Sequence, residues 1–402
     1  MNQSLSKLTS RGFALVCHPW MGFGGSEATT MWTLQALQNA GHAGVAFVSA
    51  SPVDFEKLNR VYGTSVSPEK IGVIRAPKLP GVNSGGRLAH LQSGWFQRYC
   101  RGLAPGYEVC VSAYNFVDFG RPGIQLVGDY TFSEALRRLL DPDAFRLARH
   151  RDHLPRRLYI TAGDLLRGDA DRPLPGRGDH VLANSDWTRG ILSQNLGVAC
   201  AGVLFPPVAF NPLADDKSNS ARDPLGFVCL GRIAPEKRVE PMIRILDRVR
   251  DAGFPVNFHI AGSFETPEYG REIQKLAATR DWVSLPGFLA AGERDGLLKR
   301  VSFGLHARPA EAFGIAVAEM AGSGCIPFVP AVGGPAEIVE NEDLRFNTED
   351  EAVEKIVAVL SRPETHADLR ARLAGSMDRF RPEVYMETFL REFDAFRATQ
   401  QG

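Results

Sequence analysis

The sequence has no long apolar run and no excess of charge of either sign. No stretch reaches the roughly 18 consecutive apolar residues that a membrane-spanning helix requires, and the opening residues are too polar for a signal peptide. Lysine plus arginine and aspartate plus glutamate both number 46, so no net field favours nucleic acid or a membrane surface. We therefore expect a cytoplasmic protein without a nucleic-acid partner.

The cysteines lack the pattern of a redox motif or a zinc site. There are six, and no two of them form a Cys-x-x-Cys pair. Several lie inside apolar, strand-like runs, which predicts buried thiols. Reduced, buried thiols are typical of a cytosolic protein.

The length and the alternation of patterns predict two α/β domains. A chain of 402 residues, 44% of them hydrophobic, is too long for one ordinary core. Short apolar runs alternate with helix-like segments in both halves, as at 13–17, 26–39 and 45–50, which predicts parallel sheets. The glycine-rich stretch 81–95 is expected to be a loop.

A Pro-Pro step at Pro206-Pro207 marks the expected domain boundary, because neither a helix nor a central strand tolerates it. We expect a first domain at 1–206 and a second at 207–378. The remaining residues, 379–402, are amphipathic and are expected to form a helix that packs across the junction or onto the first domain.

The stretch from Ala307 to Glu340 carries two carboxylates around a short apolar run. A helix that begins near Gly314 would put Glu311 just before its start and Glu319 one to two turns in. Eight residues along a helix span roughly 12 Å, so the two carboxylates suit the two ends of one elongated ligand. The free N–H groups of the helix start would face an anion between them.

A second group of candidate site residues follows the first expected strand of the second half, at 226–233. Arg232 and Lys237 flank the start of a helix that is expected to begin after Pro235. Two cations beside helix-start amides favour a diphosphate. The alternative is a pair of surface salt bridges, which does not explain why the cations gather at this turn.

The first half has a glycine loop directly after its first strand. Gly22, Gly24 and Gly25 imitate the dinucleotide fingerprint, but Glu27 stands where a third glycine is needed, so NAD binding is disfavoured. The loop is either a tight connection or one whose amides approach a phosphate or an acceptor.

Two further features of the first half allow two readings each. Asp129 follows a strand, so it contacts an acceptor or sugar, or it only closes a turn. The basic segment 137–157 is a solvated helical face or a patch for an anionic acceptor or lipid headgroups. His150 and His153 have no third ligand beside them, and the sequence has no convincing Asp-x-Asp site, so we expect no metal.

Together these landmarks resemble the retaining glycosyltransferases of family 4. The strongest elements are Gly231-Arg232 followed by Pro235-Glu236-Lys237, and the Glu311-x7-Glu319 motif. The loop at 24–27, the Asn184-Ser185 turn and the Pro-Pro linker are similar to the same family.

The resemblance implies a GT-B fold, with two Rossmann-like domains whose parallel sheets face a central cleft. Residue by residue, it implies that Arg232 and Lys237 bind the diphosphate and act in catalysis. It implies that Glu311 contacts the transferred sugar and is a third catalytic residue, and that Glu319 binds ribose hydroxyls. Backbone groups would complete the donor site, at Gly24, Gly25, Gly231, Phe313, Gly314 and Ile315.

One departure concerns a histidine that many relatives carry at the end of a first-domain strand. The comparable step here is Gly128-Asp129, so the histidine is missing. Asp129 and His18, which directly follows the first strand, are the candidates for an acceptor or sugar contact.

We therefore expect a retaining transferase that moves a sugar from UDP or GDP to a hydroxyl of a glycan, a lipid-linked or a small-molecule acceptor. No cofactor and no metal is expected. The alternatives are a sugar-nucleotide epimerase, a phosphorylase, or a nucleotide-sugar binding protein without turnover. Peripheral contact with the inner face of a membrane would run through 137–157. The sugar, the acceptor and the oligomeric state are left undetermined.

Overall fold

The computed structural model describes residues 12–79, 88–142, 145, 153–168, 172–210 and 222–401. The chain divides into two compact units. Unit 1 comprises Met1–Glu134, Ala148–Pro207 and Pro382–Gly402, and unit 2 comprises Ala135–Leu147 and Val208–Arg381. Each unit therefore contains a segment that lies far from its main part in sequence.

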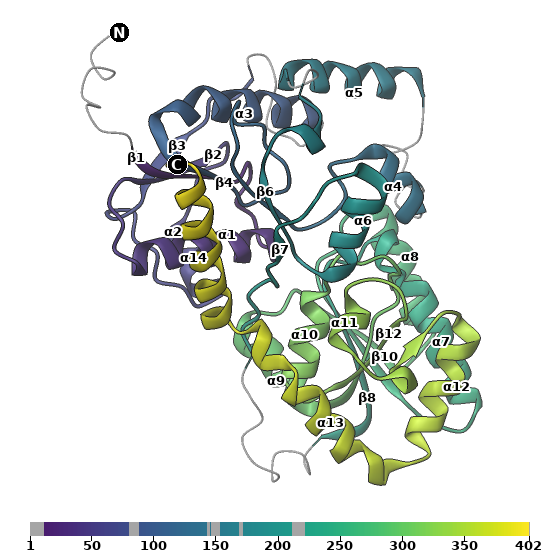
Figure 1. Cartoon of the computed structure of the whole chain (residues 1–402). Helices are drawn as coiled ribbons and strands as arrows, with labels where there is room; N and C mark the ends of the chain where they lie inside the picture. Colours follow the sequence, from purple (N-terminus) through teal and green to yellow (C-terminus); the bar gives the residue numbers. More distant parts are fainter. Residues whose placement is uncertain are drawn as a thin grey trace. The chain divides into compact units, whose positions relative to one another are not determined.

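Unit 1 is built on a parallel sheet of seven strands in the order β3-β2-β1-β4-β5-β6-β7 (Figure 1). Its central strands are continuous apolar runs because helices cover both faces of such a sheet. In β1, Leu15 pairs with Ala46 on one side and with Cys110 on the other. The strands are β1 Gly12–Cys17, β2 Val45–Ser49, β3 Gly72–Arg75, β4 Tyr107–Ser112, β5 Ile124–Val127, β6 His180–Ala183 and β7 Gly202–Val203.

The helices of unit 1 begin where side chains can cap them. Asp54 accepts the N–H of Lys57, and Ser185 accepts the N–H of Thr188. The helices are α1 Gly25–Asn39, α2 Phe55–Tyr62, α3 Ala89–Leu103, α5 Leu154–Arg167, α6 Asp186–Leu196 and α14 Pro382–Thr399.

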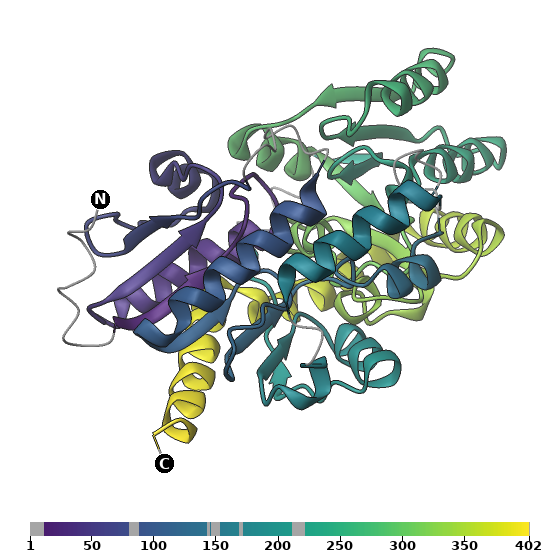
Figure 2. The same ribbon diagram turned by 90° about the horizontal axis from the view of Figure 1, so that it is seen from above.

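The expected loop at 81–95 is wrong in its second half. Helix α3 begins at Ala89, and its Phe96 and Cys100 are buried. Residues 81–87 lie outside the described residues. The glycines suggested a loop, but Gly94 lies inside α3, where it allows close packing against α5. A Cβ at this position would come 2.4 Å from the backbone oxygen of Gly163 in α5. Figure 2 shows the two helices side by side.

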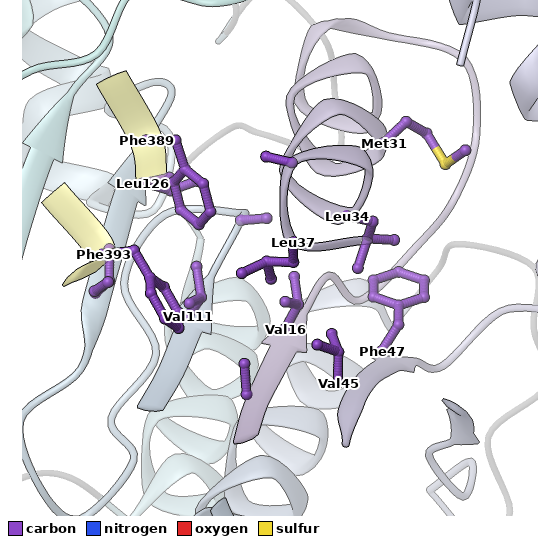
Figure 3. Packing of buried hydrophobic residues seen from close by; sticks show 14 of the residues in the cluster. Val16, Met31, Leu34, Leu37, Val45, Phe47, Val111, Leu126, Phe389 and Phe393 are labelled. Atoms are coloured by element: carbon purple, nitrogen blue, oxygen red, sulfur yellow. The ribbon is translucent and has the colours of Figure 1, made fainter. Parts of the chain in front are cut away.

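The C-terminal helix α14 belongs to the core of unit 1. Phe389 and Phe393 are fully buried and pack with Leu37 of α1 and Val16 of β1 (Figure 3). The hydroxyl of Tyr385 lies 2.7 Å from that of Thr33 in α1. The last residues of the chain thus close the apolar face that the first helix presents.

Unit 2 repeats the same winding with six parallel strands in the order β10-β9-β8-β11-β12-β13 (Figure 1). Phe227, Phe303 and Phe328 come from adjacent strands, and their rings lie 5.0–6.3 Å apart in the core. The strands are β8 Asp223–Leu230, β9 Asn257–Ala261, β10 Val283–Gly287, β11 Val301–Leu305, β12 Ile326–Pro330 and β13 Arg345–Phe346.

Most helices of unit 2 lie between these strands in sequence, but α4 precedes β8, and α12 and α13 follow β13. They are α4 Glu134–Leu140 (from Ala135 on), α7 Val239–Asp251, α8 Pro267–Ala278, α9 Ala291–Arg300, α10 Ile315–Gly322, α11 Pro335–Ile338, α12 Glu349–Leu360 and α13 His366–Gly375. The two predicted Rossmann-like domains with parallel sheets are confirmed. Over the described part of the chain, no helix combines the length and apolar character needed to cross a bilayer.

Candidate functional site

The candidate site of unit 2 forms at the carboxyl ends of β8 and β11, which are neighbours in the sheet. Gly231 and Arg232 follow β8, and His306 follows β11. Parallel strands bring their carboxyl ends to one edge, which is where open α/β sheets bind ligands. The sequence placed candidate residues at this edge.

The segment after β8 differs from the prediction in one detail. The expected helix start after Pro235 is wrong, because Pro235–Lys237 is a single 3₁₀ turn and α7 begins at Val239. Arg238 between them has a φ of 55°, a left-handed conformation that interrupts the helix. Lys237 therefore projects from a turn.

Lys237 and Glu311 form an ion pair in the described structure. Their side chains are mostly buried, with 23% and 15% exposed. Burial acts to raise the pKa of Glu311, but the cations of Lys237 and Arg308 outweigh it and hold that pKa far below its usual value. Glu311 is therefore ionised near neutral pH.

Arg308 and Asp141 extend this ion pair, and sequence reasoning missed both. The Arg308 Nη1 lies 3.4 Å from Oε2 of Glu311, and its Nη2 lies 2.9 Å from Oδ2 of Asp141. Arg308 stands three residues before Glu311, and that spacing was a usable signal. Asp141 comes from the segment after α4, far away in sequence, so nothing in the local pattern could reveal it.

His306 is the other residue that sequence reasoning missed. It is 6% exposed, and its Nε2 lies 4.0 Å from Oε2 of Glu311. Burial lowers its pKa to about 4, against the smaller opposing effect of Glu311. The imidazole is therefore neutral near pH 7 and adds no charge to the site.

Helix α10 begins at Ile315, as predicted, with Gly314 at its N-cap. Gly314 has a φ of 100°, which disfavours any residue with a side chain. Gly334 packs against this turn so tightly that a Cβ would lie 2.4 Å from the carbonyl oxygen of Ala312. The first N–H groups of a helix have no partner within it, so Ile315 and its neighbour present donors at this end.

Phe313 has its ring in the core, where it contacts Phe380 edge-on with centroids 5.2 Å apart. Only its backbone is available for the predicted donor contact. Its side chain therefore anchors the turn before α10.

Glu319 is held by a cation of its own. Its Oε1 lies 3.1 Å from Nη1 of Arg294 in α9. Burial raises the pKa of Glu319, and Arg294 opposes that effect. The two carboxylates of the motif are thus paired with separate cations, as two distinct contact points would require.

Arg232 pairs with other carboxylates than Glu311, the partner of Lys237. Its side chain is 54% exposed and is paired with Glu236 at 3.0 Å and with Glu265 at 2.9 Å. An exposed guanidinium at the end of β8 can turn toward an incoming anion with little desolvation.

The glycine loop of unit 1 uses part of its hydrogen-bonding capacity internally. The N–H of Gly24 donates to the hydroxyl of Tyr62 at 2.8 Å, and the N–H of Gly22 donates to Glu27 at 3.1 Å. Gly25 is the first residue of α1. The side chain of Glu27 fills the space where the dinucleotide fingerprint needs a third glycine.

His18 and Asp129 also lie in unit 1. His18 is 2% exposed, its ring lies 5.0 Å from that of Tyr114, and burial lowers its pKa to about 3. Asp129 accepts hydrogen bonds of 2.8 Å from Asn115 and from the N–H and hydroxyl of Thr131. The Asp129 contacts are those of a residue that closes a turn.

No group of three histidine, cysteine, aspartate or glutamate side chains that could hold a metal ion occurs among the described residues. His150 lies outside them, and His153 caps the start of α5 by accepting the N–H of Arg156.

Residues 211–374 match the family described as Glycosyl transferases group 1. The chain carries a glycosyl transferases group 1 domain. This domain spans β8 to α13 and contains Lys237, Glu311 and Glu319.

Two curated relatives match part of the chain. The Dictyostelium discoideum protein GDP-Man:Man(3)GlcNAc(2)-PP-Dol alpha-1,2-mannosyltransferase is 31% identical over 240 residues, which is 52% of this chain and 46% of that protein. The protein of the same name from Debaryomyces hansenii is 28% identical over 184 residues, 40% of this chain and 30% of that protein. The chain thus matches less than half the length of either relative.

Solved structures with the same fold cover nearly the whole chain. WaaG, a glycosyltransferase involved in lipopolysaccharide biosynthesis, has a TM-score of 0.66 at 14% identity and covers 94% of this chain and 99% of its own. Anabaena HepE in complex with UDP and glucose has a TM-score of 0.66 at 14% identity, with 95% and 99% covered. Sucrose-phosphate synthase from Thermosynechococcus elongatus has a TM-score of 0.67 at 15% identity, with 97% and 100% covered. These likenesses confirm the GT-B fold.

Proposed function

We propose that the protein is a retaining, metal-independent glycosyltransferase of family 4 that uses a UDP- or GDP-sugar as donor. The observation that carries this proposal is the buried Lys237–Glu311 pair beside the start of α10, inside a glycosyl transferases group 1 domain. An epimerase, a phosphorylase or a silent binding protein is less well supported, because the relatives named above are transferases.

In this proposal, the second unit holds the donor. Lys237 and Arg232 supply positive charge to the diphosphate, and the first N–H groups of α10 add donors. The ionised Glu311 accepts hydrogen bonds from hydroxyls of the transferred sugar, while Glu319 accepts them from the ribose. Gly231, directly after β8, provides backbone that can approach the donor.

The reaction proceeds by attack from the face on which the diphosphate leaves. The bond between the anomeric carbon and the phosphate oxygen breaks, and a bond to the acceptor oxygen forms. The acceptor hydroxyl gives its proton to the departing phosphate oxygen. Because the acceptor attacks from the face on which the diphosphate leaves, the anomeric configuration is retained. Lys237 and Arg232 stabilise the negative charge that develops on the departing phosphate oxygen.

The acceptor is proposed to be a glycan hydroxyl, and a lipid-linked glycan is the form we favour. Both curated relatives carry a PP-Dol acceptor in their names, and WaaG is involved in lipopolysaccharide biosynthesis. His18 and Asp129 of unit 1 are kept as proposed acceptor or sugar contacts.

A lipid-linked acceptor suggests a peripheral membrane contact in unit 1. The predicted segment 137–157 lies partly outside the described residues, at 143, 144 and 146–152. The helix that follows, α5, carries Leu154, Leu158 and Leu165 with 69%, 62% and 71% of each residue exposed. Their spacing puts them on one helical face, which supports contact of α5 with a lipid surface.

We propose that this surface is the cytoplasmic face of a membrane. All six cysteines are free, and five of them are buried. Unpaired thiols are typical of a reducing compartment.

A thermal-shift screen with UDP, GDP and their sugars tests the donor site. Binding to the folded state raises the melting temperature, so the correct nucleotide is the one that stabilises most at a fixed concentration. Lys237→Ala is expected to abolish the shift, whereas Lys275→Ala, on the exposed side of α8, is expected to keep it.

Transfer assays test the reaction. Lys237→Ala and Arg232→Ala are each expected to reduce turnover by about 10²–10³, and the product is expected to keep the anomeric configuration of the donor. Normal turnover in both variants, or conversion of the nucleotide sugar without transfer to an acceptor, would contradict the proposal.

A further inference from the structure

Arg308 lies between two carboxylates that come from distant parts of unit 2. One is Glu311, three residues further along the chain. The other is Asp141, from the separate segment Ala135–Leu147 of unit 2. The Arg308 and Asp141 side chains are 12% and 7% exposed, so this ion pair is nearly as buried as a core residue. Buried charges are costly unless each is paired.

The charges in this cluster balance without a ligand. Lys237 and Arg308 are positive, Glu311 and Asp141 are negative, and burial keeps the nearby His306 neutral. Each carboxylate has a cation, and Arg308 contacts both carboxylates. A diphosphate that enters beside Lys237 disturbs this balance.

The disturbance follows from the geometry of Lys237. Its ammonium group is a single point of charge, already in contact with Glu311. When it turns to a phosphate oxygen, Glu311 loses its nearest cation while still buried. Burial by itself favours the protonated carboxyl, so Glu311 stays ionised only if another cation replaces Lys237.

Arg308 is placed to be that cation. Its Nη1 lies 3.4 and 3.5 Å from the two Glu311 oxygens, slightly longer than a normal charge-assisted hydrogen bond. Its Nη2 donates to Asp141 at 2.9 Å, which fixes the plane of the guanidinium. A small approach of Nη1 completes the contact with Glu311.

We propose that Arg308 takes over as the counter-ion of Glu311 when Lys237 turns to the diphosphate, and that Asp141 is the residue that positions Arg308. This inference rests on the proposed function, since it concerns the same donor site. Arg308 acts through Glu311 and Lys237, and it does not contact the phosphate itself.

The test is a double-mutant cycle on nucleotide affinity, measured by calorimetry with whichever of UDP or GDP binds the wild-type protein. Arg308→Gln is expected to weaken binding by about tenfold or more, because Lys237 can then leave Glu311 only at the cost of an unpaired buried charge. In a Glu311→Gln background, the same Arg308→Gln change is expected to alter affinity less than about twofold, because no carboxylate needs the counter-ion.

Two further variants keep the test valid if Arg308→Gln folds poorly. Arg308→Lys keeps the charge but cannot bridge both carboxylates, so it should retain part of the affinity and enter the same cycle. Asp141→Asn weakens the contact that positions Arg308 but keeps the Arg308 side chain itself, so it should lower affinity by a smaller factor. Arg244→Gln removes an exposed pair with Glu349 and serves as the control, with affinity unchanged.

Three outcomes would overturn the inference. An equal loss from Arg308→Gln in both backgrounds means that Arg308 binds phosphate directly. Wild-type affinity in Arg308→Gln means that Arg308 has no part in binding. If the wild-type protein binds neither nucleotide, the proposed function itself fails. If it binds a nucleotide and gives one of the first two results, only the proposed role of Arg308 fails.

Discussion

Side chains of the candidate site in unit 2 differ in charge because burial and ion pairing act on them in different proportions. The pKa of Glu311 is lowered because two cations outweigh its burial, and the pKa of Glu319 is raised because one cation does not. His306 is neutral because its burial outweighs the nearby Glu311. One region of the fold thus holds a fixed anion, a titratable carboxyl and a neutral imidazole.

Buried His306 predicts a loss of stability in mild acid. Its pKa is about 4 in the folded protein and 6.5 in the unfolded chain, so between these values the unfolded state binds more protons. The contribution of His306 to the free energy of unfolding is therefore fully present at a pH above its pKa in the unfolded chain. It falls as the pH drops toward its pKa in the folded protein. Between about pH 7.5 and pH 5 the loss amounts to about 2 kcal/mol.

Urea denaturation of the wild-type protein and of His306→Gln at these two pH values measures this effect. The wild-type protein is expected to lose more stability than the variant by the stated amount. Identical pH dependence in the two proteins would show that His306 does not titrate on unfolding.

The sequence singled out Lys237, Glu311 and Glu319 as candidate site residues because each belongs to a short motif. It missed His306 and Arg308, although both lie in the strand end and loop just before Glu311. Asp141 could not be found, since its contact with Arg308 joins segments 167 residues apart. Local spacing reveals residues on one turn, whereas pairing across a fold depends on packing.

At the scale of elements, helix ends explain most of the agreement between pattern and structure. Gly314 stands where the sequence predicted a helix to begin, and the helix-like segment predicted at 26–39 is α1, Gly25–Asn39. The start of α7 was misplaced because Arg238 adopts a left-handed conformation that no residue preference predicts. The start of α3 was missed because glycine there serves close packing and not a loop.

Helix α14 predicts a strong dependence of unit 1 on its last residues. Phe389→Ala removes a fully buried ring between α14 and α1, and such a change costs about 3–5 kcal/mol. Val384→Ala, on the same helix but 38% exposed, is expected to change the free energy of unfolding by less than about 0.5 kcal/mol.

Chemical denaturation followed by tryptophan fluorescence compares these two variants. Trp20, Trp32, Trp95 and Trp187 all lie in unit 1, so the signal reports largely on that unit. Equal stability of the two variants would mean that α14 contributes little to the core.

At the scale of the whole molecule, the two units share one plan. The strand order 3-2-1-4-5-6 of unit 1 is repeated by the strands of unit 2, each counted from its own first strand. Alternating apolar and helical patterns predicted parallel sheets in both halves. The strand order was not predicted, because periodicity does not say which strands are neighbours.

The exposed leucines of α5 predict binding of the whole protein to lipid. The wild-type protein is expected to sediment with vesicles of phosphatidylcholine and phosphatidylglycerol in equal parts, because the apolar face can enter the headgroup region. A variant with serine at 154, 158 and 165 is expected to remain in the supernatant.

Phe288→Ser is the matched control, since that side chain is also well exposed, at 65%, but belongs to unit 2. It should sediment like the wild-type protein. Sedimentation of the triple-serine variant to the same extent would rule out α5 as the lipid contact.

The return of α14 to unit 1 has a consequence for how the protein is made. A ribosome releases the chain from its N-terminus, so β1 and α1 emerge long before residues 382–399. Until then, the apolar face around Leu37 has no cover, and unit 2 can complete its own sheet first. The nascent chain therefore carries an exposed, aggregation-prone surface for most of its synthesis, and a chaperone that binds apolar segments would find it there.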